Sequence, residues 1–149
     1  MIKWVYKDYA DLSRDELYEI LSLRQEVFIM EQNCNYLDAD NYDLQSSHLM
    51  AYKNNQLIAY MRIVSAGVIY LNISFGRILV KKEYRNLGVG KELLKRGVGL
   101  FSPETILVMS AQVYLIKFYE YFGFHSVGEE YLEDEIPHIK MIRNGNSLS

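Results

Sequence analysis

One short segment limits the fold of this chain more than any other. Residues 84–94 read YRNLGVGKELL, with Gly88 and Gly90 lying between a β-rich stretch and an apolar run that has helical spacing. Glycines at these positions let backbone N–H groups approach a phosphate closely, and the positive end of the following helix adds favourable charge. The segment therefore predicts a strand, a tight phosphate-binding loop and a helix in direct succession.

Two common phosphate loops do not fit this segment. A P-loop needs a glycine five residues before the final Gly-Lys pair and a Ser or Thr after the lysine, but Arg85 and Glu92 stand there. A dinucleotide-binding fingerprint needs a third glycine, and Leu93 takes its place. The chain before the loop also looks like a series of antiparallel strands rather than the start of a βαβ unit. Neither nucleotide-binding class is therefore favoured.

Hydrophobic spacing predicts the elements on either side of the loop. Ser13 begins a capping box with Glu16, so an amphipathic helix is expected to run to about Met30. Asn54–Asn55 tolerate the positive φ of a tight turn and predict a hairpin over 48–64. Further strands are expected over 2–9, 67–82, 104–111, 124–127 and 138–143, and further helices over Gly88 to about Gly97 and over 113–124. This order predicts an α+β (mixed α/β) domain around one central sheet.

Length and composition exclude several classes of protein. A chain of 149 residues is long enough for one domain with a substantial core. Its apolar runs are short and its N-terminal stretch lacks the apolar core of a signal peptide, so we expect a cytoplasmic protein without a membrane segment. Cys34 is the single cysteine, which excludes an internal disulfide. Together with the three histidines it shows no metal-ligand spacing, so no metal site is expected.

Charge is distributed unevenly along the chain. Seven basic residues lie between Arg77 and Arg96, whereas the stretch from Val27 to Tyr52 holds four acids and no Lys or Arg. A second acidic stretch, EEYLEDE, covers residues 129–135. This segregation suggests an anionic ligand near the glycine loop and a cationic ligand elsewhere. Nucleic acid is not expected as a partner, because the basic segment is short and the whole chain has a net charge of −3.

A third type of phosphate loop, Arg/Gln-x-x-Gly-x-Gly/Ala after an apolar strand, fits residues 85–90. LVKKEYRNLGVGKELL resembles the pyrophosphate loop of the GNAT superfamily of N-acetyltransferases, and AQVYLIKFYEYFGF resembles the later motif of that superfamily. LRQEVFIMEQNCNYLDADNYD, GRILV and YLEDEIPHIKM resemble its ElaA-like branch, so that the likeness covers nearly the whole chain. The resemblance implies that residues 1–149 form a single GNAT-like domain, in which helices flank a central mixed, splayed β-sheet and acetyl-CoA occupies the cleft.

The resemblance also assigns roles to individual residues. It implies that the backbone N–H groups of one strand pair with pantetheine and stabilise the oxyanion. These are the N–H groups of Ile78, Leu79 and Val80. The pyrophosphate would be held by the loop residues Arg85, Asn86, Leu87, Gly88, Val89, Gly90 and Lys91. Gln112 stands where many members have an Asn that binds the pantetheine arm. Tyr119 matches the tyrosine that in many members protonates the departing thiolate.

Three residues are candidates for the base that removes a proton from the amine. An alkyl amine with a pKa of about 10.4 is almost wholly protonated at neutral pH, so a base is required. Glu31, His138 and His48 are the candidates, and each has a structural alternative: binding loop N–H groups, tying down the end of a strand or capping a strand edge. Arg24 could orient an acceptor carboxylate, or it could form an ion pair with the acidic loop.

These observations predict an acetyl-CoA-dependent N-acetyltransferase that acts on a primary amine by direct attack, without a metal. The acidic stretches favour a cationic acceptor: a small-molecule amine, a polyamine, a lysine side chain or a peptide N-terminus. The rival hypothesis is a domain that binds acetyl-CoA or a partner without turnover, because its cofactor loop would look the same. Homodimerisation is left open.

Overall fold

The computed structural model describes residues 1–144, and these form seven strands, three α-helices and several short helical turns. The strands are β1 Lys3–Asp8, β2 Ser46–Lys53, β3 Gln56–Val64, β4 Ile73–Val80, β5 Leu107–Gln112, β6 His125–Glu133 and β7 Ile136–Arg143. The helices are α1 Arg14–Arg24, α2 Val89–Gly99 and α3 Ile116–Glu120, and a π-helix, η2 Gln25–Glu31, continues α1. The 3-10 turns are η1 Tyr9–Asp11, η3 Tyr42–Gln45, η4 Lys82–Tyr84 and η5 Val113–Leu115.

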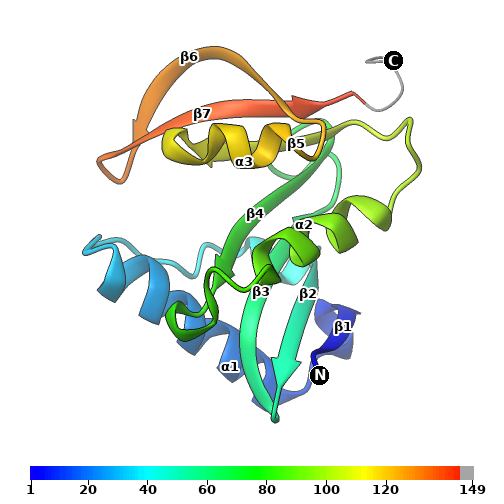
Figure 1. The fold of residues 1–149 in the computed structure, drawn as a ribbon, viewed down its shortest axis with the longest axis vertical. Helices are drawn as coiled ribbons and strands as arrows, with labels where there is room; N and C mark the ends of the chain where they lie inside the picture. The colour runs from blue at the N-terminus through cyan, green and yellow to red at the C-terminus, as the bar shows by residue number, and fades with distance from the viewer. Residues whose placement is uncertain (145–149) are drawn as a thin grey trace.

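All seven strands join one mixed sheet in the order β1-β2-β3-β4-β5-β7-β6. Its single parallel pair joins β4 to β5, and this pairing covers only Ile73–Phe75 against Leu107–Met109. Beyond Phe75 the two strands separate, and β4 runs on toward β1–β3 and α1 while β5 stays with β6, β7 and α3 (Figure 1). The predicted α+β fold with a splayed mixed sheet is confirmed.

Helices cover both faces of the sheet. Leu49 and Ala51 pack in one buried cluster with α2, whereas Met50 between them packs in the other cluster with α1. Because successive strand residues point to opposite faces, α1 and α2 lie on opposite sides of β2. The α1 side of β5 is therefore the side of Ser110, since its neighbours Met109 and Ala111 belong to the α2 cluster.

Local sequence signals explain most of the element boundaries. Ser13 and Glu16 form the predicted reciprocal capping box at the start of α1. Asn54 and Asn55 have φ values of 51° and 62°, as the predicted turn between β2 and β3 requires. The end of α2 was predicted at Gly97 or Gly99, and the helix ends at Gly99, so Gly97 lies within its last turn. A Cβ on it would lie 2.0 Å from the Met61 side chain, so this glycine allows the helix to pack closely on β3.

The C-terminal third differs from the prediction in two ways. The helix expected over 113–124 is shorter, because η5 precedes a five-residue α3. The strand expected over 124–127 runs on to Glu133, so β6 and the turn at Asp134 and Glu135 contain the second acidic stretch. Its side chains are almost all exposed, which hides the alternation that a half-buried strand would show.

A bulge in β4 bends this strand at the start of the cleft. The register with β3 shifts between Tyr60 and Arg62, and Arg77 has a φ of 50°, which is rare for a residue with a side chain. Three bonds hold Arg77 there: its Nε and Nη2 donate to the side chain and carbonyl of Asp38, and Nη2 also reaches Asp40. The strain at the bulge is thus offset by ion pairs from a loop distant in sequence.

Candidate active site

A cleft of about 1000 Å³ opens where β4 and β5 separate. It is lined by residues of η2, the loop that follows it, β3, β4, the glycine loop, β5, α3 and the β6–β7 turn. Nearly all of the residues predicted for the site line it, namely Glu31, Ile78, Leu79, Val80, Arg85, Asn86, Gly88, Gly90, Lys91, Gln112, Tyr119 and His138. Leu87 and Val89 do not, because the side chain of Leu87 is exposed and that of Val89 packs in the core.

The glycine loop has the geometry that a phosphate cradle requires. Gly88 is the N-cap of α2 with a φ of 82°, and the N–H of Glu92 donates to its carbonyl, so the N–H groups of the three residues between them have no partner within the helix. A Cβ built on Gly88 would meet no atom within 4 Å, so the space before the loop is open to a ligand. The residues present therefore fit a pyrophosphate group.

Arg85 holds a carboxylate at this cradle. Its Nε donates to the Val80 carbonyl at 2.8 Å, which fixes the guanidinium at the end of β4. Its two terminal nitrogens donate to both carboxylate oxygens of Glu31, the last residue of η2. These hydrogen bonds hold the pKa of Glu31 below its ordinary value. Glu31 is thus placed beside the phosphate loop as an anion paired with an arginine.

The edge of β4 faces the cleft. Pairing with β5 ends at Phe75, so the backbone groups of Ile78–Val80 on that edge are available to an extended ligand. Gln112 lies across from them at the end of β5, and its side-chain amide donates to Gln32 at 3.4 Å. An arm bound against β4 would therefore lie between the strand edge and an amide side chain.

Tyr119 reaches the cleft from α3, with its ring packed among aromatic side chains. The ring is 5% exposed and meets Phe118 edge to face at 5.3 Å, and Phe124 lies on its other side at 6.4 Å. Burial raises the pKa of Tyr119, so its hydroxyl keeps its proton at neutral pH. The side chain is thus available as a proton donor, and it contributes to the core as well.

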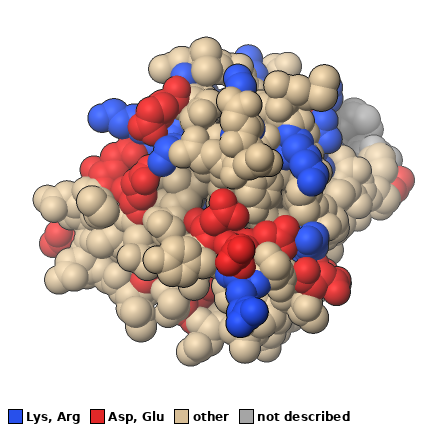
Figure 2. Space-filling model, turned by 90° about the horizontal axis from the view of Figure 1, so that it is seen from below, with Lys and Arg blue, Asp and Glu red and all other residues tan. Residues whose placement is uncertain are grey.

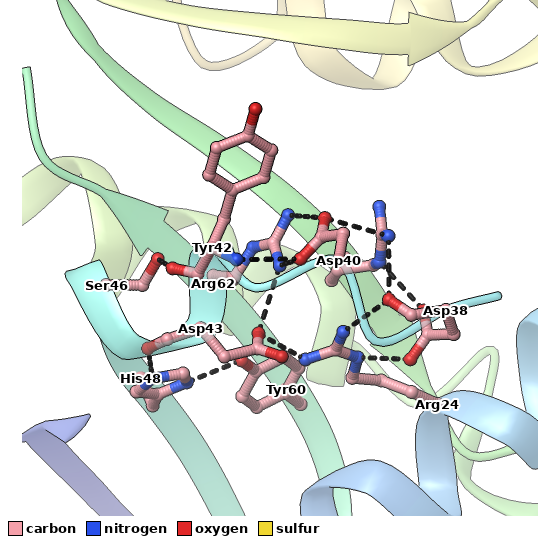
Figure 3. Close-up of polar contacts among 10 residues, drawn as sticks. Arg24, Asp38, Asp40, Tyr42, Asp43, Ser46, His48, Tyr60 and Arg62 are labelled. Atoms are coloured by element: carbon pink, nitrogen blue, oxygen red, sulfur yellow. Dashed lines mark hydrogen bonds and ion pairs between the residues drawn. The ribbon is translucent and has the colours of Figure 1, made fainter. Parts of the chain in front are cut away.

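The acidic loop after η2 binds three arginines. Arg24 donates to Asp38 and Asp43, and Arg62 donates to Asp40 and Asp43 (Figure 3). Arg77 completes the set through Asp38 and Asp40. Arg24 is fully buried, and of the two alternatives for this residue the ion pair is confirmed.

This network changes the interpretation of the charge pattern. We expected the acids of this loop to favour a cationic ligand, but three aspartates meet three arginines there and their charges cancel. The loop contains no Lys or Arg, but arginines from α1, β3 and β4 pair with its aspartates. Figure 2 shows the same tendency on one face of the molecule, where acidic and basic side chains lie beside one another.

His48 belongs to the same network and not to the cleft. It is fully buried; its Nδ1 lies 2.6 Å from the Tyr60 hydroxyl and its Nε2 lies 3.0 Å from the Asp43 carbonyl. A carbonyl can only accept, so Nε2 carries the proton and the Tyr60 hydroxyl donates to Nδ1. Burial lowers the pKa of His48, which keeps the ring neutral. His48 is therefore a structural residue and not the base.

His138 lines the cleft from β7, where it lies directly opposite Gln112 of β5. The sequence analysis did not identify its polar neighbours Ser110, Tyr131 and Glu133. The Tyr131 ring stacks on that of His138 at 6.3 Å, and its hydroxyl bonds to Ser110. The hydroxyl of Ser110 among apolar neighbours in β5 was a usable signal, whereas the other two residues lie in the part of β6 that was not predicted.

Two features are absent from residues 1–144. No group of three or more His, Cys, Asp or Glu side chains there is placed to hold a metal ion. No helix in that part of the chain is long and apolar enough to cross a membrane.

Fold and cleft together define an acyltransferase of the GNAT type, and comparison with known proteins agrees. A sequence model of the acetyltransferase (GNAT) domain matches residues 10–144, so the chain belongs to this family. It is 41% identical to the UPF0039 protein sll0451 of Synechocystis, covering 95% of this chain and 94% of that protein. It is 38% identical to protein ElaA of Escherichia coli, covering 96% and 97%.

Solved structures place the fold in the same group. The crystal structure of Escherichia coli ElaA superimposes with a TM-score of 0.90 at 37% identity, covering 96% of this chain and 99% of that one. An acyl-CoA N-acyltransferase from Pseudomonas aeruginosa gives 0.89 at 39% identity, covering 95% and 99%. The predicted ElaA-like resemblance is confirmed.

Proposed function

We propose that this chain is an acetyl-CoA-dependent N-acetyltransferase that acts on a primary amine. One observation carries the proposal: a single cleft joins an open glycine cradle, an unpaired strand edge and the side chain of Tyr119. Bound acetyl-CoA would supply an activated acetyl group as a thioester. The chain's own residues would position it, exclude water and move protons.

The residues divide these tasks along the cleft. The N–H groups after Gly88 and the Arg85 guanidinium would bind the pyrophosphate. Backbone N–H groups of Ile78–Val80 would hold the arm and donate to the carbonyl oxygen as negative charge develops there. When the amine nitrogen bonds to the acetyl carbon and the carbon–sulfur bond breaks, Tyr119 would give its proton to the thiolate.

The test has a binding arm and a turnover arm. Coenzyme A at 100 times its dissociation constant should stabilise the fold by about 2.7 kcal/mol, which thermal denaturation detects. Arg85→Ala should weaken coenzyme A more than pantetheine, which lacks the pyrophosphate. Arg96→Ala is the matched control, because Arg96 belongs to the same basic stretch but pairs with Glu92 and lies over Trp4.

Turnover is measured as thiol release from acetyl-CoA with a panel of amines. Release that depends on the amine supports the enzyme. Stabilisation by coenzyme A without release from any acceptor would instead support the rival hypothesis, a domain that only binds. If Arg85→Ala binds both coenzyme A and pantetheine as tightly as the unchanged protein does, the assigned cofactor site is contradicted.

A further inference from the structure

Four polar side chains form a cluster beside the cleft, on the α1 side of the sheet. Ser110 is on β5, His138 is on β7, and Tyr131 and Glu133 are on β6. Tyr131 lies directly opposite His138 in the register, and Glu133 follows two residues later, so these side chains share a face. We call Ser110, Tyr131, Glu133 and His138 the hairpin cluster.

One hydrogen bond places a proton on Nδ1 of His138. Nδ1 lies 2.7 Å from the carbonyl oxygen of Ile136, which can only accept, so Nδ1 is the donor. In the neutral ring, Nε2 then has a free lone pair. Nε2 lies 3.5 Å from Oε2 of Glu133, so two acceptors face one another when the ring is neutral, and the two groups form an ion pair when it is charged. A donor with positive charge is the group that such a pair of acceptors would bind.

The other members of the cluster fix the carboxylate of Glu133. Its Oε1 accepts from the Ser110 hydroxyl at 3.3 Å, and that hydroxyl also bonds to Tyr131. The other carboxylate oxygen of Glu133, Oε2, therefore faces His138. The Glu133 side chain is 50% exposed while that of His138 is 8% exposed, so a ligand can approach the glutamate from solvent and the histidine from the cleft.

Charge at this end of the cleft also favours a cation. Arg62 and Arg77, which line the cleft, are paired with Asp38, Asp40 and Asp43, so these carboxylates offset their charge. Across residues 1–144, neither Glu133 nor Asp134 forms a salt bridge with a Lys or Arg, although both line the cleft. Lys140 lies directly opposite Ser110 in the register, and its ammonium is placed over the Tyr70 ring at 5.5 Å.

We propose that the acceptor is a primary ammonium that lies beside Nε2 of His138 and Oε2 of Glu133 and contacts both. This rests on the function proposed above and adds the acceptor site to it. Nε2 of His138 takes one proton from the ammonium, and the neutral nitrogen bonds to the acetyl carbon. The nitrogen's second proton leaves with solvent as the amide forms, and the sulfur departs protonated by Tyr119. Glu133 holds the nitrogen in position and binds the cation before reaction.

The surroundings of the cluster limit what can carry the ammonium. Tyr36, Ile69, Tyr70 and Ile136 line the same part of the cleft, and these side chains suit an aliphatic or aromatic arm. The acceptor class is therefore a primary amine on an apolar chain. A free amine and a lysine side chain of a peptide both have this chemistry, and kinetics with each type of compound distinguishes them.

The test compares Glu133→Gln with Glu130→Gln, its matched control. Glu130 is exposed on the same strand and does not line the cleft. Both substitutions change the net charge of the protein equally. Glu133→Gln should raise KM for the amine about tenfold or more, because a charge-assisted bond to the ammonium is lost, with little change in kcat. Glu130→Gln should leave both constants unchanged.

His138→Gln tests the base. It should lower kcat about a hundredfold or more, while stabilisation by coenzyme A stays as in the unchanged protein. That stabilisation also shows that the variant is folded. Amine binding to the coenzyme A complex is measured by calorimetry as well, so the site is tested even without turnover.

Failure of this inference differs from failure of the proposed function. If no amine gives thiol release and coenzyme A does not stabilise the protein, the proposed function is wrong. If thiol release occurs but Glu133→Gln behaves as Glu130→Gln does, the ammonium site is wrong while the enzyme stands. A preference for anionic acceptors would overturn the ammonium site in the same way.

Discussion

Glu31 and Arg85 form a two-pronged ion pair beside the glycine loop, joining the end of η2 to the end of β4. Under the proposed function a pyrophosphate would compete with this carboxylate for the same guanidinium. Glu31 therefore lies beside the phosphate cradle, whereas His138 belongs to the hairpin cluster on β5, β6 and β7.

The first prediction follows from that competition. Glu31→Gln should bind coenzyme A severalfold more tightly, because Arg85 is released from a competing charge. Glu26→Gln is the control, since Glu26 lies on the same π-helix but pairs with Lys81. Calorimetric titration checks both. Weaker binding in Glu31→Gln would contradict the competition, and a hundredfold loss of turnover with binding intact would identify Glu31 as the base in place of His138.

A second prediction separates backbone strain from ligand contact. Gly88 and Gly128 have φ values of 82° and 78°, and a Cβ on either would meet no atom within 4 Å. Gly88→Ala and Gly128→Ala should therefore destabilise the fold by similar amounts, about 1 kcal/mol. Only Gly88→Ala should also lose affinity for coenzyme A. Equal coenzyme A affinity in the two variants would remove the glycine loop from the site.

Tyr119→Phe is the third prediction. It should lower kcat by about tenfold or more and leave coenzyme A affinity unchanged, because only the proton donor is removed. Tyr121→Phe makes the same chemical change on a neighbouring residue that is 74% exposed. Steady-state kinetics and titration of both variants suffice. Full turnover in Tyr119→Phe would leave this residue with a packing role alone.

The fourth prediction concerns the buried network. Asp43→Asn should cost about 3–5 kcal/mol of stability, since it removes the partner shared by two buried arginines, Arg24 and Arg62. Glu130→Gln, far from the network, should cost almost nothing. Urea denaturation at neutral pH measures both. A loss below 1 kcal/mol for Asp43→Asn would mean that solvent replaces the missing carboxylate.

The same residue predicts how stability depends on pH. Burial opposes ionisation of Asp43, but hydrogen bonds and charge from Arg24 and Arg62 outweigh it and hold its pKa below the ordinary 3.8. A carboxyl with a depressed pKa in the folded state stabilises the fold fully above its unfolded pKa and loses this effect as pH falls through the folded pKa. Stability should therefore drop below about pH 4 in the unchanged protein, and less steeply in Asp43→Asn.

Particular residues show how far the sequence alone could lead. The capping box at Ser13, the Asn54–Asn55 turn and the Gly88 loop depend on local backbone chemistry, and each was predicted. The splay of β4 from β5 was expected only through resemblance, because no local pattern encodes the end of a strand pairing. An ion pair of Arg24 with the acidic loop was one of two alternatives, whereas the pairing of Asp43 with Arg62 was not predicted, because Arg62 lies 19 residues away on another element.

The hairpin of β6 and β7 forms one end of the sheet. Substitutions in its outer strand therefore affect the fold differently from substitutions in β4 or the glycine loop. The outer strand is almost wholly exposed, so substitutions there remove little buried surface, whereas β4 and the glycine loop are fastened to the core and to the arginine network. Under our proposals, the choice of acceptor can diverge through a few surface substitutions in β6. The means of holding the acetyl donor would be retained while that happens.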